Sequence, residues 1–265
     1  MQSALSRLRK EFKLGQYRCA ALLGQGEYQI LQVDSPNVPE PEVRDAVRWR
    51  LKDMLDYPVQ SATIDVLDIP STGAMSGRAK SIFAIAANNS VIGSCMNLFD
   101  TARIPLEVID IPELAQRNIA ALFEEGNRGL AMLSFNEYGG MLTFTYKGEL
   151  YASRRIEVTL NQLVESDADH RQRYIERIGL ELQRSLDLFD RQYSTISLKQ
   201  LLLTPVPGVP ELHQYLSTNL DTPVALLDLA HAVDFSTAPE LEDAARQAQC
   251  LQTIGVALRS EQAPS

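Results

Sequence analysis

The sequence has few cysteines, one tryptophan and no long apolar run. Cys19, Cys95 and Cys250 are odd in number and far apart, so the sequence shows neither a disulfide framework nor a metal-ligand spacing. Reduced thiols in a cytosolic protein are the simplest account, and we expect Cys95 in the core. No stretch approaches the roughly 20 apolar residues that span a bilayer. Because the first residues lack the apolar segment of a signal peptide, we expect a protein kept in the cytoplasm.

Positive charge is also scarce. The chain has 25 Lys and Arg against 34 Asp and Glu, which gives a net charge of −9. Such an acidic surface repels phosphate backbones, so general nucleic-acid binding is not expected. The 265 residues suffice for one large domain or two smaller lobes. Hydrophobic residues make up 45% of the chain, which is typical of a globular protein and excludes a disordered chain.

The order of predicted elements indicates a mixed α+β protein. Apolar runs at 17–34 predict a hairpin that turns at Gly24 and Gly26. The rest of the first half predicts a Pro-rich linker at 35–40, a helix from Pro41, strands at 61–69 and 79–87 around a loop at 71–77, a helix at 88–103, a strand at 105–111 and a helix at 112–126. The second half predicts a meander at 129–135, 140–146 and 149–156, a polar connection at 157–170, a helix at 171–191, a strand at 197–204, a helix from Pro210 to 219, a strand at 222–229 and a helix at 239–259.

Residues 1–16 are basic and mildly amphipathic. Their cations and apolar residues are Arg7, Arg9, Lys10, Lys13, Leu5, Leu8 and Phe12. A frayed tail or short surface helix is one interpretation, and weak attachment to an anionic membrane surface is the other.

Other chemistry-bearing residues form no recognisable site. The three histidines, His170, His213 and His231, are scattered, and the sequence lacks the Gly-x-Ser-x-Gly nucleophile motif. Asp65 and Asp68 are three residues apart on a predicted strand, so they point to opposite faces and cannot share acid–base chemistry. The pairs Arg154–Arg155 and Arg171–Arg173 are open to two interpretations, an acidic partner or a solvated face.

Three stretches carry a resemblance to a known family. They are RWRLKDMLDYP at 48–58, PLEVIDIPELAQRNIAALFE at 105–124, and the segment at 181–229 that begins ELQRSLDLFD and ends TPVALLDL. In this order they resemble the PilM family of pilus assembly proteins, in the FtsA/PilM branch of the actin-like ATPase superfamily. The resemblance covers about 17–259 and is strongest to members that serve mannose-sensitive haemagglutinin (MSHA) pili.

The resemblance implies a two-lobed, actin-like (ribonuclease H-like) α+β fold with an inserted subdomain. The implied organisation is a basic segment at 1–16, a first lobe at 17–127 with an insert at 36–110, a second lobe at 128–259 with a reduced insertion, and a tail at 260–265. Family members are cytoplasmic and reach the inner membrane through partners. The implied partner is the cytoplasmic tail of a PilN-like inner-membrane protein, with the pilus assembly ATPase as a further candidate.

By resemblance, the tail would bind a groove built from 17–34 and 36–111. We predict Arg48, Trp49 and Lys52 at the rim of this groove, on the size of tryptophan and on charge alone. Trp49 lies off the apolar helical stripe of Val43, Val47, Leu51, Met54 and Leu55, and the alternative is that it covers a neighbouring element.

Actin-like ATPases bind Mg²⁺ and phosphates through Asp and Gly residues in two hairpins and a Gly-Gly turn near the adenosine. Here the first hairpin, YRCAALLGQGEY, has no Asp. Ser134-Phe135-Asn136 stands in place of Asp-x-Gly, and two prolines interrupt the turn from Thr204 to Gly208. We therefore predict no catalytic residue, metal or cofactor, and a degenerate nucleotide cleft made of Ser134, Asn136, Gly139, Gly140, Thr204 and Gly208.

Two rival functions remain. The first is a true switch that binds ATP and Mg²⁺ through unconventional ligands. The second is an FtsA-like, membrane-tethered polymer subunit, which only the basic residues at 1–16 favour.

Overall fold

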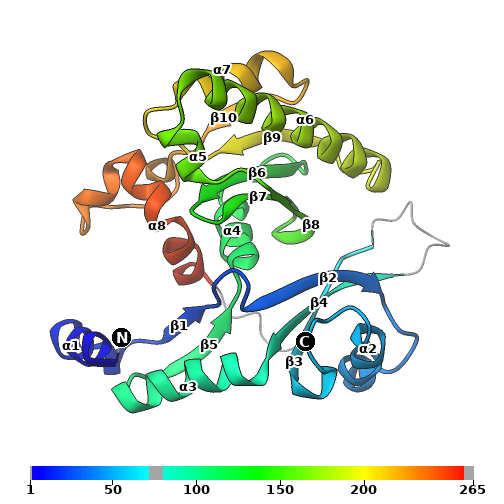
Figure 1. Ribbon diagram of the computed structural model, residues 1–265, viewed down its shortest axis with the longest axis vertical. Coiled ribbons are helices and arrows are strands. Elements are labelled where there is room, and N and C mark those ends of the chain that lie inside the picture. The colour runs from blue at the N-terminus through cyan, green and yellow to red at the C-terminus, as the bar shows by residue number, and fades with distance from the viewer. Residues whose placement is uncertain (1, 72–79, 260–265) are drawn as a thin grey trace. The chain divides into compact units, whose positions relative to one another are not determined.

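The computed structural model describes residues 2–71 and 80–259, and the chain divides into two compact units, 1–112 and 113–265 (Figure 1). Each unit is described by itself. Apart from Ser71, the loop predicted at 71–77 lies outside the described residues, as does the predicted tail at 260–265.

The first unit holds two separate sheets. Its elements are α1 (Gln2–Phe12), β1 (Cys19–Leu22), β2 (Tyr28–Asp34), α2 (Val43–Leu51), β3 (Ala62–Asp68), β4 (Ser81–Asn88), α3 (Asn89–Ala102) and β5 (Leu106–Asp110). Strands β2, β4 and β3 form an antiparallel sheet in that order. Strand β1 pairs in parallel with β5, from Cys19 opposite Leu106 to Leu22 opposite Asp110.

The hairpin predicted at 17–34 is therefore wrong. Strands β1 and β2 both form, but β2 pairs along its whole length with β4. The reason lies in β4, whose residues are buried or half-buried throughout. A strand this apolar suits the centre of a sheet, and it takes β2 on one side and β3 on the other. The insert was predicted at 36–110. Strand β2 precedes residue 36 but pairs with β4, which lies inside these bounds. Strand β5 lies inside these bounds but pairs with β1, which lies outside them.

Helix α2 supplies the core of the three-stranded sheet. Val47 and Leu51 are fully buried against Ile64, Ile82 and Ala84. The predicted helical spacing is confirmed for these residues, although the helix ends at Leu51 rather than at Leu55.

The second unit is built on one five-stranded sheet in the order β10-β9-β6-β7-β8. Its elements are α4 (Pro112–Ala121, which begins at the last residue of the first unit), β6 (Gly129–Asn136), β7 (Gly139–Tyr146), β8 (Glu149–Ile156), α5 (Leu160–Glu165), α6 (Ala168–Gln192), β9 (Leu198–Leu203), α7 (Pro210–Asn219), β10 (Val224–Leu226) and α8 (Ala244–Ala257). The predicted meander is confirmed, because β7 pairs antiparallel with both β6 and β8. Strand β9 is parallel to β6, and β10 is parallel to β9. The ribonuclease H-like order is a three-stranded meander whose first strand, here β6, also pairs in parallel with a later strand, here β9.

Three helices in this unit, α5, α6 and α8, begin at side-chain caps. Asp167 accepts a hydrogen bond from the amide of His170, so α6 begins at Ala168, before the predicted start. Thr159 and Gln162 form a capping box that makes a short helix, α5, within the predicted polar connection at 157–170. Asp243 caps α8, which divides the helix predicted at 239–259. Helix α4 ends at Ala121 rather than at Gly126.

The predicted apolar face of α6 is confirmed and packs on the sheet. Ile175, Ile178, Leu182, Leu186 and Phe189 are buried, and the rings of Phe189 and Phe144 stack with centroids 4.5 Å apart. Among the described residues, no helix is both long enough and apolar enough to cross a membrane.

Gly255 on α8 lies close against the backbone of α4. A Cβ atom there would lie 2.2 Å from the backbone oxygen of Ala115 on α4. We expect Gly255→Ala to lower the free energy of unfolding by about 1–3 kcal/mol, since overpacking forces the helices apart. Denaturant unfolding measures this. Gly93→Ala on α3, where a Cβ meets nothing within 4 Å, is the matched control and should be neutral or stabilising. Equal stability of both variants would contradict the packing described.

Candidate functional site

The predicted cleft residues of the second unit gather at the carboxyl ends of β6 and β9. Leu133 pairs with Leu203, and the amide of Thr204 donates to the oxygen of Leu133 at 2.9 Å. Asn136 pairs with Gly139 across the β6–β7 turn. The structure thus brings Ser134, Asn136, Gly139, Gly140 and Thr204 to one end of the sheet, and Gly208 follows in the turn that leads to α7.

The β6–β7 turn is closed by the side chain of Asn136. Its Oδ1 accepts hydrogen bonds from the amides of Tyr138 at 2.9 Å and Gly139 at 3.1 Å. Two successive amides that converge on one oxygen form an anion-binding concavity of the kind that cradles phosphate. Here a neutral oxygen of the chain itself occupies the concavity, as in an Asx turn.

The two glycines of this turn are explained by close packing. Gly139 has a φ of +148°, and a Cβ there would lie 2.8 Å from the backbone oxygen of Ile156. A Cβ at Gly140 would lie 2.8 Å from the ring of Phe135. Glycine is therefore required at both positions whether or not a ligand binds.

Ser134 belongs to a buried polar network. Its Oγ donates to Oε1 of Gln116 at 2.6 Å. The Nε2 atom of Gln116 in turn donates to the oxygen of Met132 at 2.9 Å and to Oγ1 of Thr143 at 2.8 Å. Because these polar groups satisfy one another, the network holds α4 against the sheet. The hydroxyl of Ser134 is thus engaged by a side chain of α4.

The turn after β9 offers few donors. Thr204 is buried, and Pro205 and Pro207 carry no amide hydrogen. Gly208 has a φ of +78°, which lets the amide of Val209 reach the oxygen of Val206 at 3.1 Å. This geometry closes a tight turn into α7.

A second capped turn lies in the first unit, between β1 and β2. The amide of Gly24 donates to Oε2 of Glu27 at 2.6 Å, and the amide of Glu27 donates to the oxygen of Gly24 at 3.1 Å. Burial raises the pKa of the Cys95 thiol, and the negative charge of Glu27 raises it further. Cys95 itself is half-buried and does not lie in the core as predicted. The sequence analysis missed Glu27, although an acidic residue after Gly24-Gln25-Gly26 was the available signal. Its carboxylate places negative charge at the amide of Gly24.

The predicted rim residues on α2 have different surroundings. The Nη1 atom of Arg48 donates to the oxygens of Val59 and Ala62, each at 3.0 Å, so Arg48 ties α2 to the start of β3. Trp49 is 72% exposed and does not cover a neighbouring element. Lys52 directly follows the helix and is exposed. Of the three, Trp49 is the large side chain left open to solvent.

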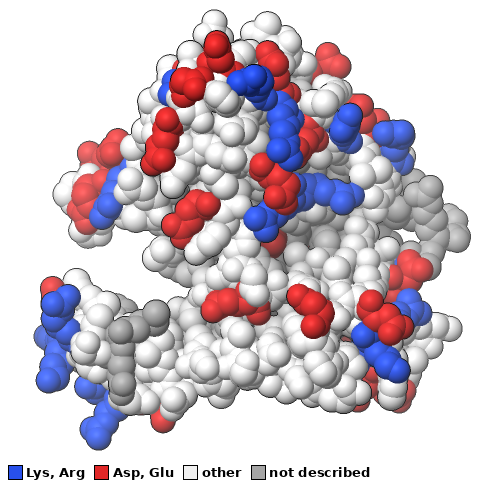
Figure 2. All heavy atoms as spheres, in the orientation of Figure 1, with Lys and Arg blue, Asp and Glu red and all other residues white. Residues whose placement is uncertain are grey.

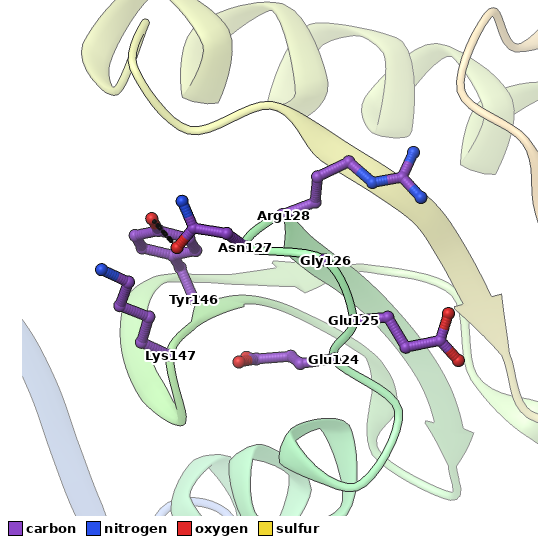
Figure 3. Close-up of a pocket in the computed structure, with 7 residues that line it drawn as sticks. All are labelled: Glu124, Glu125, Gly126, Asn127, Arg128, Tyr146 and Lys147. Carbon is purple, nitrogen blue, oxygen red and sulfur yellow. Dashed lines mark hydrogen bonds between the residues drawn. The ribbon is translucent and has the colours of Figure 1, made fainter.

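A pocket of about 250 Å³ lies at the opposite end of the five-stranded sheet, between the α4–β6 connection and the β7–β8 turn (Figure 3). It is lined by Glu124, Glu125, Gly126, Asn127, Arg128, Tyr146 and Lys147. The Tyr146 hydroxyl donates to Oδ1 of Asn127 at 2.8 Å, and Oε2 of Glu124 accepts from the amide of Gly148 at 2.9 Å. A hydrogen bond from Lys199, supported by its charge, lowers the pKa of Glu125. These contacts assemble no nucleophile with a base, and none of the predicted cleft residues lies here.

Two of the remaining candidates, His170 and Arg171, have local partners. His170 contacts Asp167 at 2.7 Å, and the amide and ring of His170 lower the pKa of that carboxylate. Arg171 donates to the backbone oxygen of Leu163 and to Glu211. Within residues 2–71 and 80–259, no three side chains of His, Cys, Asp or Glu gather as metal ligands.

The basic N-terminal segment forms helix α1, whose cations are visible in Figure 2. The Nε atom of Arg9 donates to the oxygen of Arg103 at 2.8 Å and ties α1 to the end of α3. Arg7, Lys10 and Lys13 are exposed. The helix interpretation is confirmed, and membrane attachment stays a prediction.

No protein-family model and no curated sequence matches this chain, but solved structures do. A chain of the PilM–PilN type IV pilus biogenesis complex is 19% identical with a TM-score of 0.70, over 96% of this chain and 85% of that one. The cytoplasmic domain of EpsL, an inner-membrane component of the Vibrio cholerae type II secretion system, is 12% identical with a TM-score of 0.53, over 98% and 82%. A Bacteroides thetaiotaomicron protein described as having an actin-like ATPase fold is 9% identical with a TM-score of 0.49, over 91% and 81%.

The first two likenesses, with the sheet order, establish the fold. The predicted class, an actin-like (ribonuclease H-like) α+β fold, is confirmed.

The two hydrogen bonds that Asn136 accepts should contribute to the stability of the protein. Asn136→Ala removes the acceptor of two backbone hydrogen bonds, so we expect the free energy of unfolding to fall by about 1–2 kcal/mol. Asn136→Asp keeps an acceptor oxygen and should retain most of the stability. Glu137→Ala, in the same exposed turn, is the control for changes that leave the cap intact. If denaturant unfolding gave equal stability for Asn136→Ala and Glu137→Ala, the cap would have no energetic role.

Proposed function

We propose that this protein is a scaffold of a type IV pilus assembly complex, which binds the cytoplasmic segment of a PilN-like inner-membrane protein without hydrolysing nucleotide. The observation that carries the proposal is the likeness of 96% of the chain to the solved PilM–PilN complex chain. That complex pairs an actin-like protein with PilN, and the sequence stretches at 48–58, 105–124 and 181–229 resemble the same family. The EpsL likeness extends the same architecture to a secretion system.

The finer assignment follows from the sequence resemblance. The chain is most similar to the MSHA branch, so we assign it to the role of the MSHA biogenesis protein MshI. The protein would act at the cytoplasmic face of the inner membrane, which it would reach through its partners. The pilus assembly ATPase is a further candidate partner.

The capped turns support a scaffold without nucleotide chemistry. The amides of Tyr138 and Gly139 already bond to Asn136, and the amide of Gly24 bonds to Glu27. A phosphate at either turn would have to displace the side chain that caps it, and at the turn of Gly24 it would also meet a carboxylate. Since hydrolysis needs phosphate-binding amides together with a Mg²⁺ ligand, we propose a pseudo-ATPase.

The first unit offers two features that suit an extended peptide. Strands β1 and β5 each have one strand neighbour among the described residues, so their outer edges are open to strand addition. Helix α2 holds Trp49 on a rigid support, because Val47 and Leu51 are buried and Arg48 is bonded to the backbone. A preorganised aromatic side chain is a typical binding anchor.

The partner segment provides the test. We expect calorimetric titration with the synthetic cytoplasmic segment of the PilN-like protein from the same organism to give saturable binding. Burial of Trp49 should shift its fluorescence to shorter wavelength, and this signal is unambiguous because the chain has one tryptophan. Trp49→Ala should weaken binding about tenfold or more, as expected for an anchor residue.

The matched control is Phe12→Ala, an exposed aromatic residue on α1 that is 56% exposed and should leave affinity unchanged. Equal affinity of Trp49→Ala and wild type would refute the placement of the anchor. Absence of binding by the wild-type chain would refute the adaptor function itself.

A further inference from the structure

Helix α6 carries a cationic stripe directly opposite its buried face. The buried positions, Ile175, Ile178, Leu182, Leu186 and Phe189, share one side of the helix at 3.6 residues per turn. Six exposed residues share the opposite side, and we call them the α6 stripe: Arg173, Arg177, Leu180, Arg184, Leu188 and Arg191. In Figure 2, Lys and Arg side chains lie over this helix. The stripe spans 18 steps of the helix, or about 27 Å.

Two leucines interrupt the arginines of the stripe. Leu180 is 53% exposed and Leu188 is 40% exposed. Single exposed leucines need no explanation, but these two lie in register with four arginines over five turns. The successive spacings of 4, 3, 4, 4 and 3 residues match the ladder by which one helix meets another.

The charge of the stripe is only partly neutralised by its own helix. Arg177 pairs with Glu181 at 2.8 Å, and the Nε atom of Arg191 donates to the backbone oxygen of Asp187. Arg173 and Arg184 have no hydrogen-bond or ion-pair partner among the residues that the structure describes.

Two other carboxylates beside the stripe bond to side-chain amides rather than to arginines. Glu176 accepts from Gln172 and Asp187 accepts from Gln183, each at 2.9 Å. Arg173 and Arg177 also stand four residues apart, a spacing at which like charges destabilise an isolated helix. Positive charge is therefore concentrated along this face in a protein whose net charge is −9.

We propose that the α6 stripe is a docking surface for an acidic amphipathic helix of a partner protein. Arginine forks pair with carboxylates in bidentate geometry, and apolar side chains of the partner would cover Leu180 and Leu188. A stripe one helix wide fits a second helix, which is about 10 Å across.

Two other anionic occupants fit less well. The first is an anionic membrane surface. A helix that binds such a surface needs a broad apolar face toward lipid, whereas the broad apolar face of α6 is buried on the sheet. A nucleic-acid backbone would meet the acidic side chains that border the stripe as well as the net negative charge. The surface lies wholly within the second unit, and the proposal does not depend on the PilN-like partner.

The test uses the full chain and a designed probe. The probe is a synthetic peptide of about 21 residues, or three heptads, with leucine at the a and d positions and glutamate at e and g. We expect saturable binding that weakens as salt rises, because exposed ion pairs are screened. A peptide of the same composition in scrambled order should bind at least about tenfold more weakly, because it lacks the apolar stripe.

Matched variants locate the contact. Arg173→Glu with Arg184→Glu should reduce affinity for the probe about tenfold or more, and Leu180→Ser with Leu188→Ser should also weaken it. A probe with lysine in place of glutamate should then bind the Arg173→Glu, Arg184→Glu variant better than wild type. Arg7→Glu with Lys10→Glu on α1 makes the same change in net charge at another exposed cationic helix and should leave affinity unchanged. Circular dichroism and thermal melts verify that each variant is folded.

The outcomes separate the proposal from its alternatives. Binding that depends on the stripe, prefers the amphipathic order and is rescued by charge exchange supports it. Equal binding of both peptides, or no binding, would overturn it. Stripe-dependent binding of anionic phosphatidylglycerol vesicles or of a DNA duplex in preference to the peptide would also overturn it, and would assign the surface to lipid or to nucleic acid.

Discussion

The pairing of β6 with two different neighbours is the constraint on which the second unit depends. On one side β7 returns antiparallel through a turn of two residues, and on the other side β9 runs parallel after the long helix α6. This double pairing carries Ser134 and Asn136 to the same end of the sheet as Thr204. It also requires the apolar face of α6 to cover the sheet, which leaves the opposite face of that helix to solvent. Both proposed properties of the unit, the closed turn and the cationic stripe, follow from this arrangement.

Backbone amides at the ends of strands must find acceptors, and the source of the acceptor decides the chemistry. In a phosphate-binding turn the acceptor comes from the ligand. Here it comes from the chain, as a carboxamide oxygen at Asn136 and a carboxylate oxygen at Glu27. These contacts stabilise the turns without a ligand. A scaffold that stays assembled for the lifetime of a complex suits this arrangement better than a cycling switch does.

Local patterns in the sequence predicted the second unit well. The meander was predictable because its turns contain glycine, and α6 because its apolar residues keep a strict helical period over about four turns. The first unit was harder. The pairing of β2 with β4 instead of β1 depends on burial of β4 on both sides, and a short apolar run does not reveal which neighbour a strand takes. Helix ends moved by a few residues wherever an aspartate or threonine cap, such as Asp167 or Asp243, took precedence over periodicity.

The gathering of the candidate residues was predictable, but their contacts were not. The residues expected in the degenerate cleft of the second unit do gather, since chain order places them at strand ends. Their roles depend on partners distant in sequence, such as Gln116 for Ser134 and Ile156 for Gly139. Arg48 shows the same limit. Its charge favoured a partner contact, yet two backbone oxygens that approach only in the folded chain bind its guanidinium.

The central claim is that the chain binds a PilN-like segment as a scaffold, independently of nucleotide. Calorimetric titration of the full chain with that segment, in the absence and in the presence of millimolar Mg-ATP, tests it most directly. The account predicts the same Kd in both titrations and no heat of binding for Mg-ATP alone. A change in Kd of about fivefold or more, the range of ordinary allosteric coupling, would contradict it and identify a nucleotide-controlled switch.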